Sequence, residues 1–341
     1  MRVLVTGANG FIGRVLCRKL EEAGHTVRAL VRPGSNLGSL AELNGVDIVS
    51  GDVLSPESLR RALEGVQQVV HLAGAVTAGR DSTYARVNVE GTANLAEAAE
   101  AAGVTRALFL SSLAAQGPSA PGAPHAHAGD EKPLNSYGRS KLDAERVLVG
   151  RLGPDRVIVL RAAFTYGPDH PDVAQILRWL RSRVLPVVPG LELSFLHVED
   201  LTDLLVTAVQ TDGPALGPYF VSDGTVHTME RVVDRLEGLI SERPALRLPL
   251  SAKVLGWLEP MAQRFADSAG LGATVSRVLA DLGASGWSCR PDEARERFGF
   301  EAKRSFNDTL PEVVAWYRDR GLLEADRAQR SSKAPTDTSS R

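Results

Sequence analysis

A tyrosine and a lysine four residues apart are the side chains of this sequence best suited to moving a proton. Tyr137 and Lys141 fall on one face of a predicted helix and can therefore act together. A phenol has an ordinary pKa of about 10 and is a poor base at neutral pH, but a nearby cation favours the phenolate. Upstream, Ser111 and Ser112 end a predicted strand and offer hydroxyls that can bind a substrate oxygen. The pattern indicates general acid–base chemistry by Tyr137, assisted by one of the two serines.

A glycine-rich turn follows the first predicted strand and opens the first predicted helix. Gly7, Gly10 and Gly13 can supply a positive φ, a close approach of backbone to a pyrophosphate, and close packing of helix on strand. The helix N-terminus then offers unpaired N–H groups to the anion, so this turn predicts a dinucleotide site. The residues expected to bind the nucleotide here are Thr6, Gly7, Asn9, Gly10, Phe11, Ile12 and Gly13.

The residue after the second predicted strand bears on which nucleotide binds. An acidic side chain there would bond the ribose 2′-hydroxyl of NAD, but this sequence has Arg32. A guanidinium binds phosphate through a planar fork, so Arg32, with Arg14 as a candidate helper, favours NADP(H) while NAD(H) stays possible. The alternative is a solvated arginine at a strand end.

Short β-branched runs alternate with helical segments through the first half of the chain. This alternation predicts βαβ units and an α/β fold, a Rossmann-type doubly wound parallel sheet in a dinucleotide-binding domain over 1–165, to which some later segments return. Residues 166–323 predict a smaller, mainly helical carboxyl-terminal substrate lobe that caps the sheet and contains isolated strand pieces at 194–198, 219–221 and 287–289. The polar stretch 324–341 predicts a disordered tail. The predicted strands are 3–5, 27–31, 47–49, 69–72, 107–110 and 157–160, and the predicted helices between them include 11–23, 56–64 and 87–102.

The order of these motifs resembles the extended short-chain dehydrogenase/reductase family, also called the NAD-dependent epimerase/dehydratase family, over roughly residues 1 to 320. The motifs that carry the resemblance are the glycine turn, Gly51-Asp52-Val53, His71-Leu72-Ala73-Gly74, Asn88-Val89-x-Gly91-Thr92-x-Asn94, Ser111-Ser112, Tyr137-x-x-x-Lys141 and Tyr166-Gly167-Pro168. The resemblance implies an NAD(P)-binding enzyme.

The resemblance also implies roles for particular residues. Ser112, Tyr137 and Lys141 match the catalytic set, with Ser111 as the alternative serine, and Lys141 would also bond the nicotinamide ribose. Asn88 either stabilises helix geometry near the site or is a polar residue on a helix face. The further residues expected at the cofactor are Asp52 and Val53 beside the adenine, and Leu72, Ala73 and Gly74 along the groove.

Three features favour a hydrophobic substrate, such as a steroid, flavonol or lipid-like alcohol or ketone. Arg32 resembles the NADP-type reductases, Leu113 and Ala114 stand where sugar dehydratases carry an acidic pair, and the second lobe has apolar helices around 248–265 and 271–282. The carboxyl-terminal pattern resembles the 3-beta-hydroxysteroid dehydrogenase-like or dihydroflavonol 4-reductase-like branch. The alternatives are a sugar-nucleotide epimerase or dehydratase with tightly bound NAD and a non-catalytic NAD(P)-binding sensor or assembly protein.

Composition excludes several other classes of function. The formal charge of −2 gives no sign of a nucleic-acid partner, and no apolar run reaches the ~18 to 20 residues of a membrane span. Two distant cysteines, Cys17 and Cys289, indicate a reducing, cytoplasmic location. His125 and His127 lie in a loop without clustered ligands, so no metal is expected. Family members are often dimers, which makes a homodimer possible.

Overall fold

The fold is built on seven parallel strands in the order β10-β6-β5-β4-β1-β2-β3. A computed structural model describes residues 1–76, 78, 80–170, 173, 177, 184–215, 217–240, 246–251, 254 and 281–323. The strands are β1 (Arg2–Thr6), β2 (Thr26–Val31), β3 (Val46–Ser50), β4 (Gln68–His71), β5 (Arg106–Ser112), β6 (Val157–Ala162) and β10 (Tyr219–Val221). The last of these comes from the second half of the chain and completes the sheet beside β6, as the sequence had indicated for some later segments.

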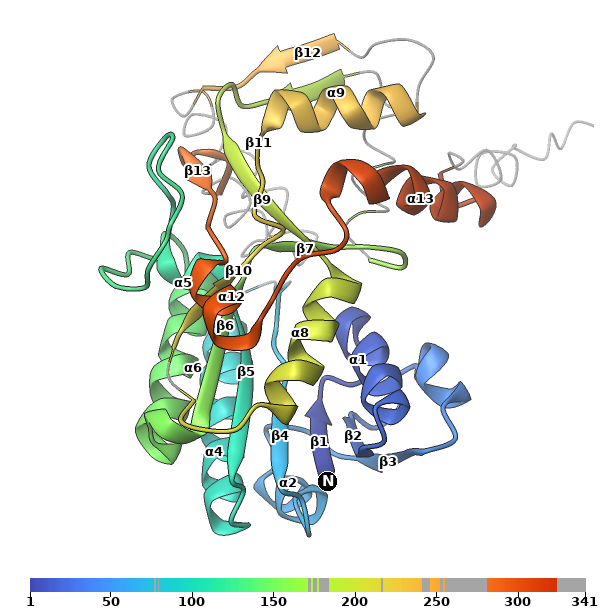
Figure 1. Cartoon of the computed structure of the whole chain (residues 1–341), viewed down its shortest axis with the longest axis vertical. Helices are drawn as coiled ribbons and strands as arrows, with labels where there is room; N and C mark the ends of the chain where they lie inside the picture. The colour runs from blue at the N-terminus through green and yellow to red at the C-terminus, as the bar shows by residue number, and fades with distance from the viewer. Residues whose placement is uncertain are drawn as a thin grey trace, which may run out of the picture.

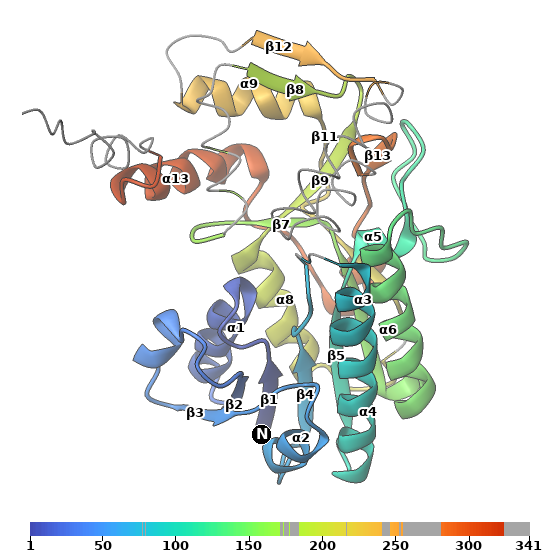
Figure 2. The same ribbon diagram turned by 180° about the vertical axis from the view of Figure 1, so that it is seen from behind.

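Helices cover both faces of this sheet (Figures 1 and 2). Successive strand residues alternate between the two cores: Val3 and Val5 pack with α1 and α8, whereas Leu4 packs on the opposite side with α2 and α4. One layer contains α1 (Phe11–Glu22), α8 (Val198–Gln210) and α12 (Asp292–Phe298), and the other contains α2 (Pro56–Ala62), α4 (Gly91–Ala101) and α6 (Ser136–Leu152). This burial on both faces explains why the strands read as continuous apolar runs.

The chain order reverses between β1 and β4, which are neighbours in the sheet although β2 and β3 separate them in sequence. From β1 the chain continues to β2 and β3 on one side of this junction, and from β4 it continues to β5 and β6 on the other side. The loops that follow β1 and β4 therefore lead away from each other. Ligands of open α/β sheets bind in the crevice that such a switch point leaves at the carboxyl ends of the strands.

A second, smaller region lies beyond the carboxyl ends of the parallel strands (Figure 1). It contains two small sheets as well as helices, so its described part is mixed where the sequence had indicated mainly helices. Leu248 and Pro249, at the start of the apolar helix expected at 248–265, lie in a strand instead. Most of the rest of that helix, most of the one expected at 271–282 and the expected tail at 324–341 lie outside the described residues. The elements of this region are β7 (Phe164–Tyr166), β9 (Glu192–His197), β11 (Val226–Thr228) and β13 (Gly286–Trp287) in one sheet, β8 (Val184–Val187) and β12 (Leu246–Pro249) in the other, and helices α9 (Met229–Ile240) and α13 (Phe306–Asp319).

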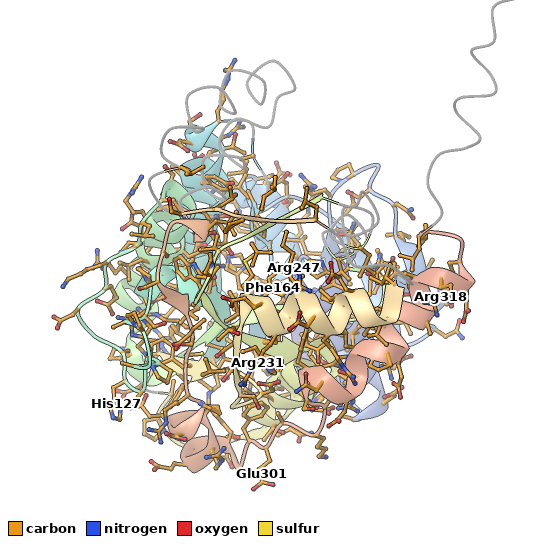
Figure 3. All side chains as sticks on the ribbon, turned by 90° about the horizontal axis from the view of Figure 1, so that it is seen from above. His127, Phe164, Arg231, Arg247, Glu301 and Arg318 are labelled. Carbon is orange, nitrogen blue, oxygen red and sulfur yellow. The ribbon has the colours of Figure 1, made fainter. Side chains whose placement is uncertain are left out.

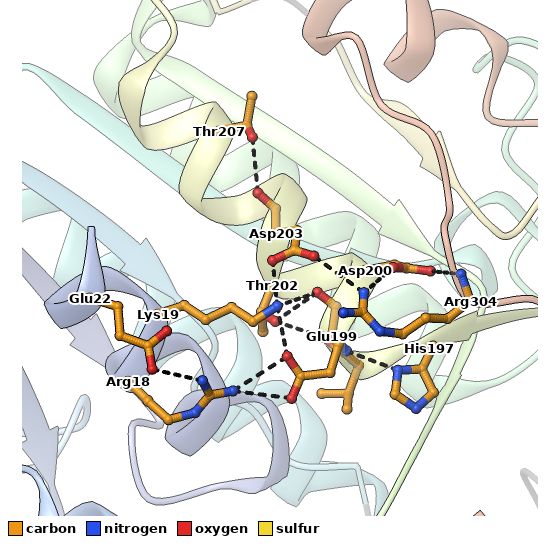
Figure 4. Close-up of polar contacts among 11 residues, drawn as sticks. Arg18, Lys19, Glu22, His197, Glu199, Asp200, Thr202, Asp203, Thr207 and Arg304 are labelled. Atoms are coloured by element: carbon orange, nitrogen blue, oxygen red, sulfur yellow. Dashed lines mark hydrogen bonds and ion pairs between the residues drawn. The ribbon is translucent and has the colours of Figure 1, made fainter. Parts of the chain in front are cut away.

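An ion-pair network joins the second region to the first helix of the sheet domain (Figure 4). Arg18 and Lys19 of α1 bind Glu199 at the start of α8, with N–O distances of 3.1 and 2.7 Å. One residue further on, the buried Asp200 accepts from Arg304, the residue that leads into α13, at 2.6 Å. A buried carboxylate without a counter-charge costs free energy, so Asp200 keeps Arg304 beside it. The start of α13, which follows Arg304, is thereby held against α8.

Inside the sheet, His71 at the end of β4 connects three elements. Its Nδ1 lies 2.6 Å from the Thr6 hydroxyl of β1, and its Nε2 lies 3.0 Å from the Thr92 hydroxyl of α4. Thr6 also accepts from the Ala73 N–H, at 3.1 Å, and Thr92 donates to the Asn88 carbonyl. The hydrogen of each hydroxyl is thereby assigned: Thr6 donates to Nδ1, and the Nε2–H donates to Thr92. His71 is a neutral imidazole in this arrangement.

Burial, with the charge of Lys141 nearby, lowers the pKa of His71 to about 3. An unfolded histidine takes up a proton below about pH 6.5, and the folded one does so only near pH 3. Between these values the unfolded chain binds more protons, so the contribution of His71 to stability is complete above about pH 6.5 and is lost as the pH falls.

We expect His71→Phe to lower the free energy of unfolding by about 2 kcal/mol at pH 7.5, because two buried hydroxyls lose a partner. The difference from the wild type should shrink at pH 4.5, where the imidazole no longer favours the folded state. Urea unfolding at the two pH values measures both effects, and His127→Asn, at an exposed position, serves as the control. A difference that is the same at both pH values would contradict the assignment.

Candidate functional site

The glycine turn and the loop after β4 approach each other so closely that side chains are excluded. Gly7 has a φ of +68°, and a Cβ on it would lie 2.8 Å from the Ala73 nitrogen. A Cβ on Gly13 would lie 2.2 Å from the Gly7 carbonyl oxygen. Both glycines are therefore required by the backbone itself, and the first turn of α1 presents N–H groups without intrahelical acceptors beside the switch point.

The predicted turn residues divide into buried supports and accessible positions. Thr6 is fully buried, and its hydroxyl is used by His71 and Ala73, so its side chain supports the turn from beneath. Asn9 donates to the Asn36 carbonyl at 3.0 Å and ties the turn to the loop after β2. The positions of the turn that remain partly or fully accessible are Gly7, Asn9, Gly10, Phe11 and Ile12.

The two arginines considered for a 2′-phosphate are in different situations. Arg32 follows β2, is exposed, and makes no side-chain hydrogen bond or ion pair with any residue that the structure describes. Arg14, on α1, is paired with Asp169 instead. Its guanidinium also lies beside Gly38. Arg32 is thus available to an incoming anion, while Arg14 would have to leave a carboxylate.

The expected adenine and groove residues lie along the same edge of the sheet. The Asp52 carboxylate, after β3, accepts from the Leu54 N–H at 2.9 Å, which turns the chain towards α2. Val53 is buried, and a Cβ on Gly91 would lie 2.7 Å from its side chain. Leu72 and Ala73 are half-buried and Gly74 is exposed, after β4. Leu72, Ala73 and Gly74 thus flank the glycine turn from the β4 side of the switch point, whereas Asp52 and Val53 follow β3 on the β1 side.

The α6 helix holds the tyrosine and the lysine. Asn135 caps its N-terminus by accepting from the Gly138 N–H at 2.9 Å, so the first turn that carries Tyr137 is fixed. Tyr137 is half-buried, and its ring meets that of Tyr84 edge-on with centroids 5.7 Å apart. One turn later, Lys141 lies on the same face of the helix.

Lys141 is a buried ammonium, 7% exposed. Its Nζ donates to the Leu110 carbonyl at 2.6 Å and lies 4.3 Å from the centre of the Phe109 ring. A Cβ on Gly74 would lie 4.0 Å from the same nitrogen. Burial lowers the pKa of Lys141 to about 8, and the carboxylate of Glu145 opposes that shift. The helix therefore brings a cation with a reduced pKa to the groove that the glycine turn opens.

The two serines at the end of β5 differ in what their hydroxyls do. Ser111 is buried and donates to the Glu145 carboxylate. Ser112 is half-buried and caps the short helix α5 (Leu113–Gln116) by accepting from the Ala114 N–H at 3.2 Å, which leaves its hydrogen available. Of the two, Ser112 is the one that can donate to a substrate oxygen.

Asn88 has a structural task that the sequence left open. The helix expected at 87–102 begins as a π-helical segment, η2 (Ala85–Glu90), before α4. Within it, the buried Asn88 amide accepts from the Ala75 N–H at 2.7 Å and donates to the Ala75 carbonyl and to Ser140 of α6, at 3.1 and 2.9 Å. Asn88 thus joins the loop after Gly74 to the helix that carries Lys141.

Sequence reasoning gave no role in the site to Glu145 or Arg161. Both are buried, and they face each other beneath the serines and the lysine. The spacing of Glu145, one helical turn after Lys141, and the charge of Arg161 at the end of an apolar strand were the available signals.

The two loop histidines are occupied by other contacts. His125 stacks on Phe220 with ring centroids 5.7 Å apart, and its backbone is bonded to Ser288, which anchors this loop beside β13. His127 lies 2.8 Å from a Glu293 carboxylate oxygen. Within the described part of the chain, no three His, Cys, Asp or Glu side chains are grouped as metal ligands, and no helix could span a membrane.

Comparison with known proteins agrees with this geometry. The model of the family described as "NAD dependent epimerase/dehydratase family" matches residues 3–220. Ceramide reductase of Caulobacter vibrioides is 31% identical over 330 residues, which cover 94% of this chain and 96% of that protein. Sterol demethylase protein B of Methylococcus capsulatus is 31% identical over 336 residues, covering 95% and 100%.

Among solved structures, the crystal structure of gox2253 is 27% identical, with a TM-score of 0.77 over 94% of this chain and 99% of that one. The predicted fold class and enzyme class are therefore confirmed. This chain is an enzyme of the NAD-dependent epimerase/dehydratase family, the extended short-chain dehydrogenases/reductases.

Proposed function

We propose that this enzyme transfers a hydride between NADP(H) and a hydroxyl or ketone carbon of a hydrophobic small molecule, with Tyr137 as the general acid/base. The observation that carries the proposal is the position of Lys141, a buried cation on the tyrosine's helix face that borders the groove at Gly74. The relatives named for ceramide and sterol support a lipid-like substrate class.

The residues present fit a dinucleotide. The space beside Gly7 and Gly13 that a Cβ would fill, and the first turn of α1, suit a pyrophosphate. Asp52 and Val53 would face the adenine, Arg32 a 2′-phosphate, and Lys141 the nicotinamide ribose. When bound, NADP(H) supplies or accepts the hydride.

The protein's own groups would manage the proton. In the direction of reduction, Tyr137 Oη donates a proton to the substrate oxygen while Ser112 Oγ donates a hydrogen bond to it. The ammonium of Lys141 stabilises the phenolate form of Tyr137 after the proton has been transferred. In the direction of oxidation, the same phenolate accepts the proton from the substrate hydroxyl.

An aromatic side chain at the site supports an apolar substrate. Phe164 is 42% exposed and begins β7, two residues after Ala162, which is the register partner of Ser112. Its ring rests against Phe195 and His170, with centroids 6.0 and 5.6 Å away. From above, Phe164 lies near the middle of the molecule, behind α9 (Figure 3). An exposed ring held in place by others is a suitable platform for a hydrophobic ligand.

We expect nucleotide-free protein to bind NADPH more tightly than NADH, and Arg32→Glu to weaken NADPH by about 10-fold or more with little effect on NADH, since a charge-assisted contact to the 2′-phosphate is lost. Calorimetric titration of both nucleotides measures this. Arg61→Glu, at an exposed position on α2, is the matched control. Retained NAD that does not exchange with added NADPH would instead favour a sugar-nucleotide epimerase.

We expect Tyr137→Phe to lower kcat for ketone reduction by about 10²-fold or more, the scale of general acid catalysis, while NADPH affinity stays near that of the wild type. Steady-state kinetics with steroid, flavonoid and long-chain ketones, together with NADPH titration, give both values. Turnover by the variant equal to the wild type would refute the role of Tyr137.

We expect Phe164→Asn to lower kcat/KM for hydrophobic ketones by about 10-fold, because the substrate loses an apolar contact surface. A small ketone such as acetone, which cannot cover the ring, should be reduced at an unchanged rate. Ile48→Asn, which alters another exposed apolar residue on the remote strand β3, is the control. An equal loss for small and large ketones would argue against substrate contact at Phe164.

A further inference from the structure

A buried charged group lies behind the proton-transfer residues, at the junction of β5, β6, α5 and α6, which lie side by side (Figure 1). Arg161, in β6, is 1% exposed, and Glu145, in α6, is 5% exposed. The guanidinium holds the carboxylate with two nitrogens: Nη2 lies 2.7 Å from Oε2, and Nε lies 3.1 Å from Oε1. Such a fork-to-fork contact fixes both partners in orientation.

The same guanidinium reaches the segments that carry the other reactive groups. Its Nη1 donates to Gln116 Oε1, at the end of the helix that Ser112 caps, at 2.6 Å. Its Nη2 also donates to Glu131 Oε1 at 3.0 Å, in the loop that leads to Tyr137. Ser111, the neighbour of Ser112, donates to Glu145. The segments before and after the serine, and the helix of the lysine, therefore meet at one buried ion pair.

The surroundings of Lys141 contain one carboxylate that raises its pKa, that of Glu145 on its own helix. From β4 it faces His71, which is neutral, and from β5 it faces the Phe109 ring and the Leu110 carbonyl. Tyr137 lies one turn earlier on α6. Lys141 and Glu145 are four residues apart on α6 and both are buried, so their side chains lie on one face of the helix. Burial disfavours the ammonium and the carboxylate opposes this effect, so the charge of Glu145 matters to the state of Lys141.

We infer that Glu145, held by Arg161, is the counter-charge that keeps Lys141 protonated during the reaction, so that the two are positioning residues for proton transfer. Because they act through Lys141, the inference rests on the proposed function. It assigns the pair an electrostatic effect on the reaction in addition to its place in the core.

The first test is Glu145→Gln, which keeps the shape of the side chain and removes its charge. Arg161 then keeps only the partly exposed Glu131 as a counter-charge, so its cation adds to the loss of the Glu145 charge, and Lys141 should release its proton at a lower pH. We expect the alkaline limb of the kcat/KM profile to move down by about one pH unit. At pH 6, where Lys141 is still protonated, kcat should stay within about 3-fold of the wild type.

The double variant Glu145→Gln/Arg161→Met separates charge from packing. Removing the guanidinium as well abolishes the positive charge that Glu145 no longer balances. The alkaline limb should therefore return part of the way and lie between those of the single variant and the wild type. If the pair only holds the elements together, the double variant should be at least as impaired as the single one with no shift of the limb, and the inference fails. The double variant removes both fully buried charges and leaves only Glu131, whose side chain is 23% exposed, without Arg161, so it tests the idea even if the single variant does not fold.

Asp200→Asn is the matched control. Asp200 is also a buried carboxylate paired with an arginine, Arg304, and it lies in α8, outside the proton-transfer group. Loss of the Asp200 carboxylate should reduce the stability of the protein and leave the alkaline limb of the kcat/KM profile unchanged. A limb that moves equally in this variant would show a general effect of destabilisation and overturn the inference.

A measurement without substrate separates the inference from the proposed reaction. The protonation of Lys141 can be followed in the free protein by NMR of isotopically labelled lysine side chains, with Lys141→Met to assign its signal. We expect the midpoint to fall in the order wild type, double variant, Glu145→Gln. If the midpoints follow this order but the protein reduces no ketone, the role of Glu145 as counter-charge is supported and the proposed reductase activity is refuted. If the midpoint of Lys141 is unchanged in both variants, the role of Glu145 as counter-charge is refuted.

Discussion

The close approach of the glycine turn to the loop after β4 is the constraint on which the site depends. At this point, a Cβ on Gly7 would lie 2.8 Å from the Ala73 nitrogen. The same nitrogen donates to Thr6, whose hydroxyl is held by His71. Backbone from both halves of the doubly wound sheet thus meets without side chains between, because the strand order reverses here. An anion-binding helix end and a groove wall are set at a fixed separation before any ligand arrives.

The remaining elements are fastened to this junction by buried polar groups. Asn88 ties the loop after Gly74 to α6, so the helix of Tyr137 and Lys141 follows the wall of the groove. On the other face, ion pairs from α1 through α8 to Arg304 tie the second region to the helix that begins at the glycine turn. Each contact is local, yet together they bring the proposed proton donor, the proposed nucleotide turn and the proposed substrate platform to one edge of the sheet.

The parts of this arrangement that follow from local patterns could be predicted from the sequence. Buried parallel strands read as apolar runs, and Gly7 and Gly13 stand where only glycine fits, so the sheet and the turn were predicted correctly. The π-helical segment around Asn88 was not, because it depends on side-chain bonds to Ala75 and Ser140 that come from distant parts of the chain. In the second region the sequence indicated isolated strand pieces but not the two sheets that they form, for a related reason: these strands have two to six residues and pair mostly with distant partners.

The buried charges show most clearly what a linear pattern leaves out. Glu145 and Arg161 look in the sequence like a helix surface residue and a strand end, and only the packing of α6 on β5 and β6 makes them partners. Such a pair costs desolvation on both ions and adds little net stability compared with an apolar pair. Next to a buried ammonium the balance differs, since the carboxylate also offsets the desolvation of Lys141. His71, held neutral by two hydroxyls, adds no second positive charge. Under the proposed mechanism, Lys141 therefore stays charged at the place where a phenolate would form, beside a carboxylate whose own partner, Arg161, fixes its position.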